Sequence, residues 1–326
     1  MKIMSATTQS SPNIALVKYW GNHDHALRLP SNPSLSMNLD GFTTTTTVEF
    51  DPALDNDVVM LGHNFITGPG RDRVSRMLDR VRQLAGLSAC AVVESRNNFP
   101  SGAGLASSAS GFAALAVAAS AAAGLQLSEA ELSRLARTGS GSACRSVPGG
   151  FVEWPLGGDD QSSYAHSIAP ADHWDLRDAV AIIDISHKLV GSSEGHALAD
   201  TSPLQASRVA TAPDRLVQAR SAVLARDFAA LAQVVELDSL MMHAVMMTSQ
   251  PVLMYWQPAT IAVLQAVGQW RKAGLPACTT IDAGPNVHIL CPAEAVNEVV
   301  RRVQAIPGVR KVLTARAGGP ARLLPR

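Results

Sequence analysis

Hydrophobic and polar residues follow two different periods in the first half of the chain. Residues 42–50, FTTTTTVEF, are dominated by β-branched side chains, which pack well on a pleated surface and lose rotamer freedom in a helix. A strand is therefore predicted there, and the short apolar run at 91–94 predicts another. The breaker series RNNFPSGAG follows, and then small residues favour a helix from about residue 105 to residue 123. The expected order is strand, glycine-rich loop, helix.

The next segments predict a helix and a buried strand before a break in the pattern. Residues 127–137 have helical spacing, with Ser128 as the expected N-cap and Glu131 three residues later in a capping box. Residues 180–185 predict the strand. GSSEGH, which follows, ends the periodicity, so we place a domain boundary here. The N-terminal domain is expected to span 1–188 and the C-terminal domain 189–326.

The second half is predicted to mix helices and strands without strict alternation. Apolar residues at helical intervals predict long helices in 213–240 and 258–273, and a shorter helix is expected at 294–305. Strands are predicted at 279–281 and 287–291, on either side of the turn DAGPN, and at 309–313. Because there is no regular βαβ order, we expect an α+β fold with two domains rather than a doubly wound sheet.

Composition restricts the class of protein. The 326 residues are 47% hydrophobic and 17% charged, which is enough apolar surface for a packed core. The 27 basic residues balance 27 acidic ones, which argues against a nucleic-acid partner or a polybasic membrane anchor. The four cysteines form no C-x-x-C pair, and residues 1–20 contain no continuous apolar segment. We expect a soluble cytoplasmic protein without a membrane partner.

The loop PSGAGLASS, at residues 100–108, has the features of a phosphate-binding loop. Gly102 and Gly104 allow backbone conformations in which successive N–H groups face an anion, and the following helix adds the positive end of its dipole. The loop lacks the Gly-Lys pair of a Walker loop, and Ser107 replaces the third glycine of a dinucleotide fingerprint. A tight turn before an alanine-rich helix is the alternative interpretation.

Two further segments carry groups suited to an anionic substrate. GSGSACR places the hydroxyls of Ser140 and Ser142 near the guanidinium of Arg145, a planar cation that suits carboxylates and phosphates, although a surface arginine would look the same. DAGPN places Asp282 at the end of an apolar strand, but a turn alone would also explain these residues. Lys18 lies in the apolar segment IALVKYWG, where its side chain either extends to solvent along the apolar surface or is partly buried, and a partly buried lysine requires a carboxylate. Asp282 can supply it only if the fold joins the two ends of the chain.

Two other patterns predict different chemistry less strongly. GSSEG at 191–195 matches the G-x-S-x-G elbow of serine hydrolases with Ser193 as the nucleophile, but the elbow requires a strand that runs straight into the serine. A metal or haem site is also suggested by the acidic residues, histidine and methionines of one helical segment, yet methionine at helical spacing usually fills a core. These residues are Glu236, Asp238, His243, Met241, Met242, Met246 and Met247.

Taken together, these segments resemble one family. SPNIALVKYWG, LPSNPSLSMNL, NNFPSGAGLASSASGFAAL, GSGSACRSVPGGF and DAGPN are similar, in this order, to signature segments of the mevalonate diphosphate decarboxylases of the GHMP kinase superfamily. The resemblance implies a GHMP kinase fold, with an N-terminal domain like domain 2 of ribosomal protein S5 and a C-terminal domain of helices over an antiparallel sheet. It also implies ATP and Mg²⁺ as cofactors, a phosphorylated mevalonate as the substrate, and a homodimer.

The resemblance also assigns residues to roles. It implies that Asp282, Lys18 and Arg145 are catalytic, with Asp282 as the base and Arg145 on the substrate carboxylate. The implied substrate-binding residues are Tyr19, Asn22, Ser140, Ser142, Ser192 and Ser193. The implied nucleotide-binding residues are Ser101, Gly102, Gly104, Leu105, Ala106, Ser107 and Ser108, and Ser108 is also the implied metal ligand.

Departures from the family pattern bear on the substrate. Family members that use the 5-diphosphate commonly carry a lysine where Asn22 stands, and bacterial members carry an arginine at the position of Ser193, followed by methionine where His196 stands. Two cations are thus absent near the distal phosphates, which favours mevalonate 5-phosphate as substrate and isopentenyl phosphate as product over the diphosphate pair. A serine hydrolase using Ser193 and a non-catalytic nucleotide-binding regulator are the alternatives from other classes.

Overall fold

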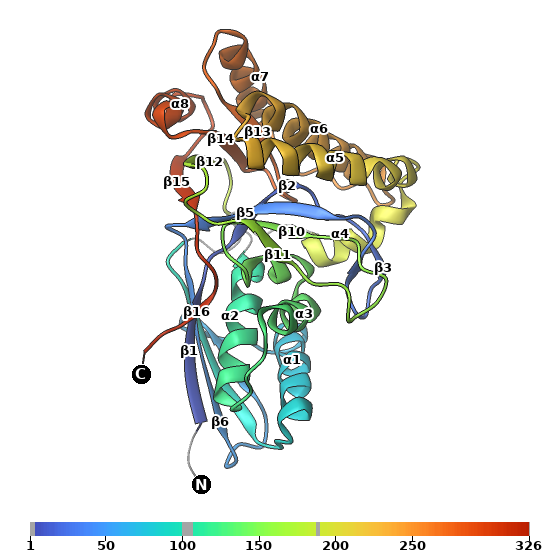
Figure 1. Cartoon of the computed structure of the whole chain (residues 1–326), viewed down its shortest axis with the longest axis vertical. Helices are drawn as coiled ribbons and strands as arrows, with labels where there is room; N and C mark the ends of the chain where they lie inside the picture. Colours follow the sequence, from blue (N-terminus) through green and yellow to red (C-terminus); the bar gives the residue numbers. More distant parts are fainter. Residues whose placement is uncertain (1–3, 100–106, 187–189, 326) are drawn as a thin grey trace.

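Two large β-sheets, a two-stranded sheet and eight α-helices are the main elements of the part of the chain described by a computed structural model, residues 4–99, 107–186 and 190–325. Figure 1 shows an elongated molecule, with the N-terminal sheet and α1–α3 at one end and α5–α8 at the other. This mixture of helices and largely antiparallel sheets confirms the α+β prediction.

The first sheet has six strands and is covered on one face by helices. Its strands, in spatial order, are β16 (Arg322–Leu323), β1 (Met4–Ser10), β6 (Thr44–Asp51), β9 (Cys90–Asn97), β7 (Val58–Leu61) and β8 (Asn64–Phe65). Alternate residues of β6 are buried, because β-branched side chains on one face pack against the helices. The strands predicted at 42–50 and 91–94 are confirmed, the second with four more residues than expected on the two sides together.

Helices α1 (Pro69–Ala85) and α2 (Ser107–Ala122) pack on this sheet, and α3 (Glu129–Gly139) packs on both of these helices. The capping box of α3 is present, because the Glu131 N–H donates to Ser128 Oγ and the Ser128 N–H donates to the Glu131 carboxylate. The short helix η1 (Gly141–Ser146) follows α3 directly and contacts both sheets, so GSGSACR lies where the two halves of the molecule meet.

The second sheet has eight strands and helices on both faces. Its main path is β11 (His166–Ala169), β10 (Phe151–Trp154), β5 (Ser34–Asp40), β15 (Lys311–Ala317), β12 (Leu176–Ile182), β14 (Val287–Pro292) and β13 (Cys278–Thr280), and β2 (Asn13–Val17) pairs with β5. One face packs against α5 (Gln205–Ala225) and α6 (Phe228–Thr248), and the other packs against α7 (Pro258–Lys272) and α8 (Val296–Gln304). The remaining elements are β3 (Asn22–Asp24), β4 (Leu29–Pro30), α4 (Ser192–Leu198), η2 (Ala199–Thr201) and η3 (Ala293–Ala295).

Two predicted elements differ from the structure in their bounds. The periodic stretch 213–240 is not one helix, because Arg226 adopts a left-handed conformation with φ of 56° and ends α5 before Asp227 caps α6. The strand predicted at 180–185 begins four residues earlier and ends at Ile182. Helix α6 is long and apolar enough to cross a membrane, but half of it is buried inside the protein, as expected of a core helix.

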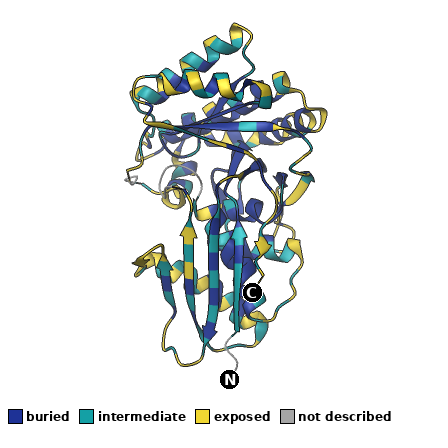
Figure 2. Ribbon diagram, turned by 90° about the vertical axis from the view of Figure 1, so that its left-hand side faces the viewer, coloured by how far each residue is buried: buried dark blue, intermediate teal, exposed yellow. Residues whose placement is uncertain are grey.

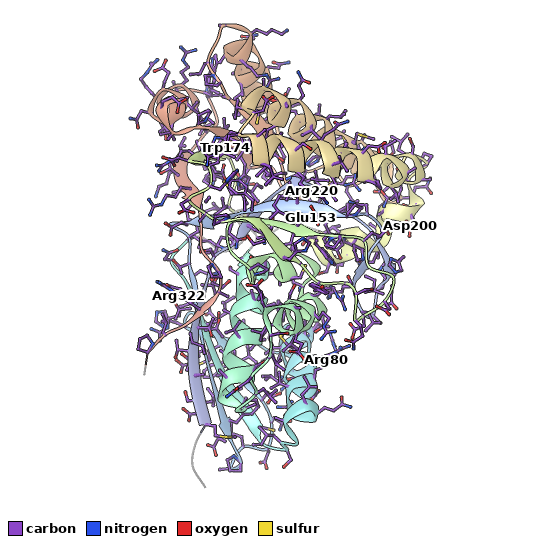
Figure 3. All side chains as sticks on the ribbon, in the orientation of Figure 1. Arg80, Glu153, Trp174, Asp200, Arg220 and Arg322 are labelled. Atoms are coloured by element: carbon purple, nitrogen blue, oxygen red, sulfur yellow. The ribbon has the colours of Figure 1, made fainter. Side chains whose placement is uncertain are left out.

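Segments from near the two ends of the chain connect the two sheets. β1 belongs to the first sheet and β2 to the second, while the C-terminal segment pairs with β5 through β15 and then with β1 through β16. Figure 2 shows that the interior of both sheets and their junction are buried. In Figure 3, Arg220 of α5 lies against Glu153 of β10, and its Nε donates a hydrogen bond to the Glu153 carboxylate over 2.6 Å. This topology brings β2 beside the segment that follows β13.

Candidate active site

A cavity of about 170 Å³ lies where the two sheets meet. Residues that are far apart in the sequence line it, because β2, η1, the start of α2, α4 and the segment after β13 all end at this junction. The residues discussed below that line it are Lys18, Tyr19, Arg28, Ser107, Ser108, Ser140, Ser142, Arg145, Ser192, Ser193, His196 and Asp282.

Lys18 and Asp282 form an ion pair in the wall of this cavity. The Lys18 Nζ lies 2.6 Å from Asp282 Oδ1, and the Lys18 side chain is 1% exposed whereas that of Asp282 is 29% exposed. The fold therefore joins the two ends of the chain as the sequence required. Burial by itself would raise the pKa of Asp282, but the Lys18 ammonium, with smaller contributions from His288 and Arg145, lowers this pKa below its ordinary value. Asp282 is ionised at neutral pH and faces the cavity.

The backbone of Lys18 is held by charged side chains that the sequence motifs did not indicate. Its N–H donates to Asp238 Oδ2 over 2.6 Å, and its carbonyl accepts from Arg208 Nη2 over 2.7 Å. Arg215 Nε donates to the other Asp238 oxygen over 2.7 Å. All three of these side chains are nearly fully buried on α5 and α6. Together they position the Lys18 ammonium against Asp282.

Arg145 is a buried guanidinium with donors left for an anion. It is 3% exposed, and its Nη1 and Nη2 donate to Ser34 Oγ over 2.8 Å and to Asn13 Oδ1 over 3.3 Å. Within the described residues, no carboxylate pairs with it and its buried Nε has no hydrogen-bond partner. Burial lowers its pKa, since no neighbouring anion fully compensates the buried charge. A substrate carboxylate in the cavity would supply that compensation.

A row of serine hydroxyls connects this cavity to a second one. Ser108 Oγ lies 3.3 Å from Ser140 Oγ, which lies 3.5 Å from Ser142 Oγ. Ser107 and Ser108 also line an apolar cavity of about 260 Å³ between α1, α2 and the first sheet, next to Val59, Ile66 and Phe112. An aromatic base in the apolar cavity and an anion at the serine row would suit a nucleoside triphosphate.

The donor set around the cavity also fits a magnesium ion that is held mainly by phosphates. Within the described residues, no group of three or more histidine, cysteine, aspartate or glutamate side chains could bind a metal. Mg²⁺ commonly keeps several waters and binds through substrate phosphates and only one or two protein oxygens. The Ser108 hydroxyl, in the first turn of α2, is placed for such a role.

Tyr19 and His196 line one end of the cavity, and Asn22 contacts Tyr19. The Tyr19 hydroxyl donates to the Asn22 side-chain carbonyl, and Asn22 is 4% exposed and does not line the cavity. The Gly21 N–H donates to His196 Nδ1 over 3.0 Å, so the proton of the neutral ring is on Nε2. Burial, together with the nearby charges of Arg28 and other cations, lowers the pKa of His196 to about 3. This end therefore offers the neutral His196 Nε2–H as a donor rather than a lysine, while the Tyr19 hydroxyl proton is already donated to Asn22.

Arg28 also lines the cavity, although no motif pointed to it. It lies between β3 and β4, and its Nε donates to the Thr138 carbonyl over 3.1 Å. The only sequence signal is a basic residue inside the short turn that follows KYWG, and such residues are usually solvated.

Ser192 and Ser193 line the cavity from the first turn of α4. The hydrolase elbow does not form, because β12 ends at Ile182 and Ser193 lies on a helix that begins ten residues later. His243 and the methionines near it belong to the core, with Met242 and Met246 at 3% and 0% exposure. Five predicted loop residues, Ser101, Gly102, Gly104, Leu105 and Ala106, lie outside the described residues.

Comparison with known proteins gives a consistent similarity over almost the whole chain. Residues 10–165 match the diphosphomevalonate decarboxylase-like N-terminal domain, and residues 179–319 match the mevalonate 5-diphosphate decarboxylase C-terminal domain. The chain is 37% identical to the phosphomevalonate decarboxylase of Haloferax volcanii, over 98% of each chain.

Solved structures of similar sequence have the same fold. The structure of mevalonate diphosphate decarboxylase from Staphylococcus aureus superposes with a TM-score of 0.93 at 37% identity over 99% of both chains. A complex of MDDEF with MVAPP, AMPPCP and magnesium superposes with a TM-score of 0.93 at 37% identity, covering 100% of both chains.

Proposed function

The chain belongs to the mevalonate diphosphate decarboxylase family of the GHMP kinase superfamily, and on that basis we propose that it is an ATP-dependent carboxy-lyase acting on mevalonate 5-phosphate. The products would be isopentenyl phosphate, ADP, phosphate and CO₂. Mevalonate 5-diphosphate, giving isopentenyl diphosphate, is the alternative substrate within the same family.

The observation that carries the activity is the arrangement of Lys18, Asp282 and Arg145 around one cavity. Mevalonate bears a tertiary hydroxyl and a carboxylate two carbon atoms away, so a decarboxylase has to hold both groups at once. Asp282 faces the cavity as a carboxylate acceptor for the hydroxyl proton, and Arg145 offers unpaired donors to the carboxylate. A kinase that only transferred phosphate would not need a cation for the carboxylate in this place.

The serine row supports ATP as the second substrate. Ser107 and Ser108 border both cavities, so a nucleotide base in the apolar cavity would bring its terminal phosphate to the hydroxyl-binding site. When bound, Mg²⁺ would bridge the nucleotide phosphates and neutralise part of their charge. The neighbour crystallised with AMPPCP and magnesium has the same fold, which supports both cofactors.

In the first step, the C3 hydroxyl oxygen attacks the γ-phosphorus while the bond from that phosphorus to ADP breaks. Asp282 orients the hydroxyl and accepts its proton. Because Lys18 keeps the pKa of Asp282 low, this carboxylate is a weak base, and we expect the proton to move only as the new oxygen–phosphorus bond forms. Lys18 in turn keeps Asp282 ionised and prevents it from turning away from the hydroxyl.

In the second step, the C3–oxygen bond breaks and phosphate leaves with the electron pair. Positive charge develops at C3, and the bond between the carboxylate carbon and C2 supplies the electrons of the new C2–C3 double bond as CO₂ departs. Arg145 would hold the carboxylate in the orientation that aligns the breaking bond with C3.

The distal end of the cavity supports the monophosphate. Asn22 is turned toward Tyr19 and is buried, Ser193 is neutral, and His196 is neutral at pH 7 because the pKa of its ring is about 3. A diphosphate carries about one more negative charge than a monophosphate, and each charge-assisted hydrogen bond contributes about 1.5–3 kcal/mol. The chain is 37% identical both to the Haloferax volcanii phosphomevalonate decarboxylase and to the Ganoderma lucidum diphosphomevalonate decarboxylase, so the choice rests on these cavity residues.

The experiment is to measure the release of ADP and CO₂ with mevalonate, its 5-phosphate and its 5-diphosphate. We expect coupled release, with the largest kcat/KM on the 5-phosphate. ATP hydrolysis without CO₂ release would overturn the decarboxylase. Installing both cations, Asn22→Lys with Ser193→Arg, should move the preference toward the diphosphate. A fluorophosphonate probe should leave Ser193 unlabelled, because the elbow of a serine hydrolase does not form.

We also expect a homodimer in the cytoplasm that uses no nucleic-acid or membrane partner, as the family resemblance and the balanced charge indicate. The molar mass by light scattering tests the dimer.

A further inference from the structure

Arg28 is a cation without an acidic partner in the wall of the substrate cavity. Within residues 4–99, 107–186 and 190–325, no carboxylate lies within ion-pair distance of Arg28, and its side chain makes one hydrogen bond, from Nε to the Thr138 carbonyl. That bond leaves both terminal nitrogens of the guanidinium for another acceptor. Arg28 is half-buried, so water does not fully solvate these donors.

The turn that carries Arg28 is held from both sides. The Leu27 N–H donates to Asp24 Oδ1 over 2.8 Å, and the Leu27 carbonyl accepts from Arg137 Nε over 3.0 Å. Arg28 itself has a positive φ of 53°, which is unfavourable for a residue with a Cβ. Such a conformation persists only when its surroundings impose it, and it is often associated with a functional site. Here it accompanies a side chain that reaches the cavity instead of solvent.

The charges around Arg28 would attract an anion. Arg73 and Arg76 are close enough to Arg28 for their positive charges to repel one another. The Arg73 guanidinium lies over the Phe112 ring, and its Nε donates to the Gly139 carbonyl. Burial, with Arg76 as the main neighbouring cation, lowers the pKa of Arg28. A phosphate at this place would relieve the repulsion among the arginines and satisfy the free donors of Arg28.

We propose that Arg28 binds the terminal phosphate of the mevalonate substrate and thereby contributes to the choice of a monophosphate. The assignment rests on the proposed function, because it takes a phosphorylated mevalonate as the substrate. Arg28 lines the cavity together with Ser192, Ser193 and His196, so its guanidinium would share the phosphate with these neutral donors. One guanidinium and these donors match a single phosphate group, whereas a second phosphate group would have no further cation from this group of residues.

The test compares substrates with and without the phosphate. In the wild-type enzyme, mevalonate 5-phosphate should bind more tightly than mevalonate by isothermal titration calorimetry. In Arg28→Gln, binding of the 5-phosphate should weaken about 10- to 100-fold, while binding of mevalonate and the KM for ATP should change less than about twofold. Arg28→Lys keeps the charge but loses the planar fork, so we expect an intermediate loss.

Arg76→Gln is the matched control, because Arg76 belongs to the same group of arginines but does not line the cavity. This variant should change the affinity for the 5-phosphate less than about threefold. Equal losses for mevalonate and its 5-phosphate in Arg28→Gln would overturn the proposal, and so would a loss that falls on ATP instead. If wild-type enzyme prefers the diphosphate, the monophosphate proposal fails separately, and a selective loss of diphosphate binding in Arg28→Gln would still support Arg28 as the phosphate ligand.

Discussion

The Lys18 ammonium lies 2.6 Å from the Asp282 carboxylate, although 264 positions of sequence separate the two residues. Lys18 follows β2, Asp282 follows β13, and both strands belong to the second sheet. The ammonium is almost completely buried while the carboxylate is partly exposed to the cavity. The Lys18 ammonium can therefore interact only with groups of the protein, such as Asp282, whereas the Asp282 carboxylate can contact both Lys18 and a substrate in the cavity.

This asymmetry predicts unequal costs when one partner is removed. Asp282→Asn leaves a buried ammonium without a counter-charge and should lower the free energy of unfolding by about 3 kcal/mol. Lys18→Met leaves a carboxylate that water can reach and should cost less, about 1 kcal/mol. In the double variant, the loss should be smaller than the sum of the two single losses, as measured by urea denaturation.

Turnover should follow a different pattern. Asp282→Asn should lower kcat by about 10²- to 10⁴-fold, since the hydroxyl loses its proton acceptor, and ATP binding should remain nearly unchanged. The exposed Asp172→Asn, which lies outside the cavity, serves as the matched control. An Asp282→Asn variant that kept most of its activity would show that another group accepts the proton.

Arg145 should be important for activity and nearly dispensable for folding. Its buried charge is not compensated by any described carboxylate within ion-pair distance, so Arg145→Met removes an unfavourable charge along with two hydrogen bonds. We expect the free energy of unfolding to change by less than about 1 kcal/mol. The kcat/KM for the mevalonate substrate should fall by at least about tenfold. A loss of several kcal/mol of stability would instead make Arg145 a structural residue.

Ser108 should affect the nucleotide and its metal. Ser108→Ala removes the hydroxyl in the first turn of α2 that borders both cavities, so the KM for ATP and the concentration of Mg²⁺ that gives half-maximal rate should both rise. Ser120→Ala, in the same helix, is the matched control, since the Ser120 hydroxyl is buried away from the cavities and has no hydrogen-bond partner in the described structure. Steady-state kinetics at varied Mg²⁺ concentration test this role. If the KM for ATP and the Mg²⁺ concentration that gives half-maximal rate are the same in the two variants, Ser108 does not bind the nucleotide or its metal.

Acid should destabilise the protein before its carboxylates titrate. Burial, with the repulsion of nearby cations, lowers the pKa of His196 to about 3 and that of His243 to about 4, so both rings are neutral in the folded protein and protonated in the unfolded chain below pH 6.5. The unfolded state then binds more protons, and stability falls as pH falls. At pH 5 the loss relative to pH 7 should be about 2 kcal/mol for each ring.

Urea denaturation at pH 5 and pH 7 measures this loss, and His243→Gln should reduce it by about half. If the variant and the wild-type protein lost the same free energy of unfolding between pH 7 and pH 5, the assignment to His243 would be contradicted.

Short motifs could be predicted because they combine unusual residues in a fixed order. The strands at residues 42–50 and 91–94, the capping box at Ser128 and the partnership of Lys18 with Asp282 were all expected from the sequence. Capping depends on neighbours in the chain, so three residues are enough to identify it.

Contacts that depend on tertiary packing could not be predicted. The buried set of Asp238, Arg208 and Arg215 holds Lys18, yet in the sequence these residues are ordinary charges on helices. Asn22 was expected beside the substrate, but it turns toward the Tyr19 hydroxyl, a choice that depends on side-chain rotamers. Arg28 lines the cavity from a turn in which its own backbone is left-handed, a feature that hydrophobic periodicity does not reveal.

A direct competition between the two phosphorylated substrates tests the proposed function most directly. With equimolar mevalonate 5-phosphate and 5-diphosphate, excess ATP and low conversion, the ratio of isopentenyl phosphate to isopentenyl diphosphate equals the ratio of the two kcat/KM values. Mass spectrometry of the products measures this ratio. We expect isopentenyl phosphate to predominate; predominance of isopentenyl diphosphate, or the absence of both products, would contradict the proposal.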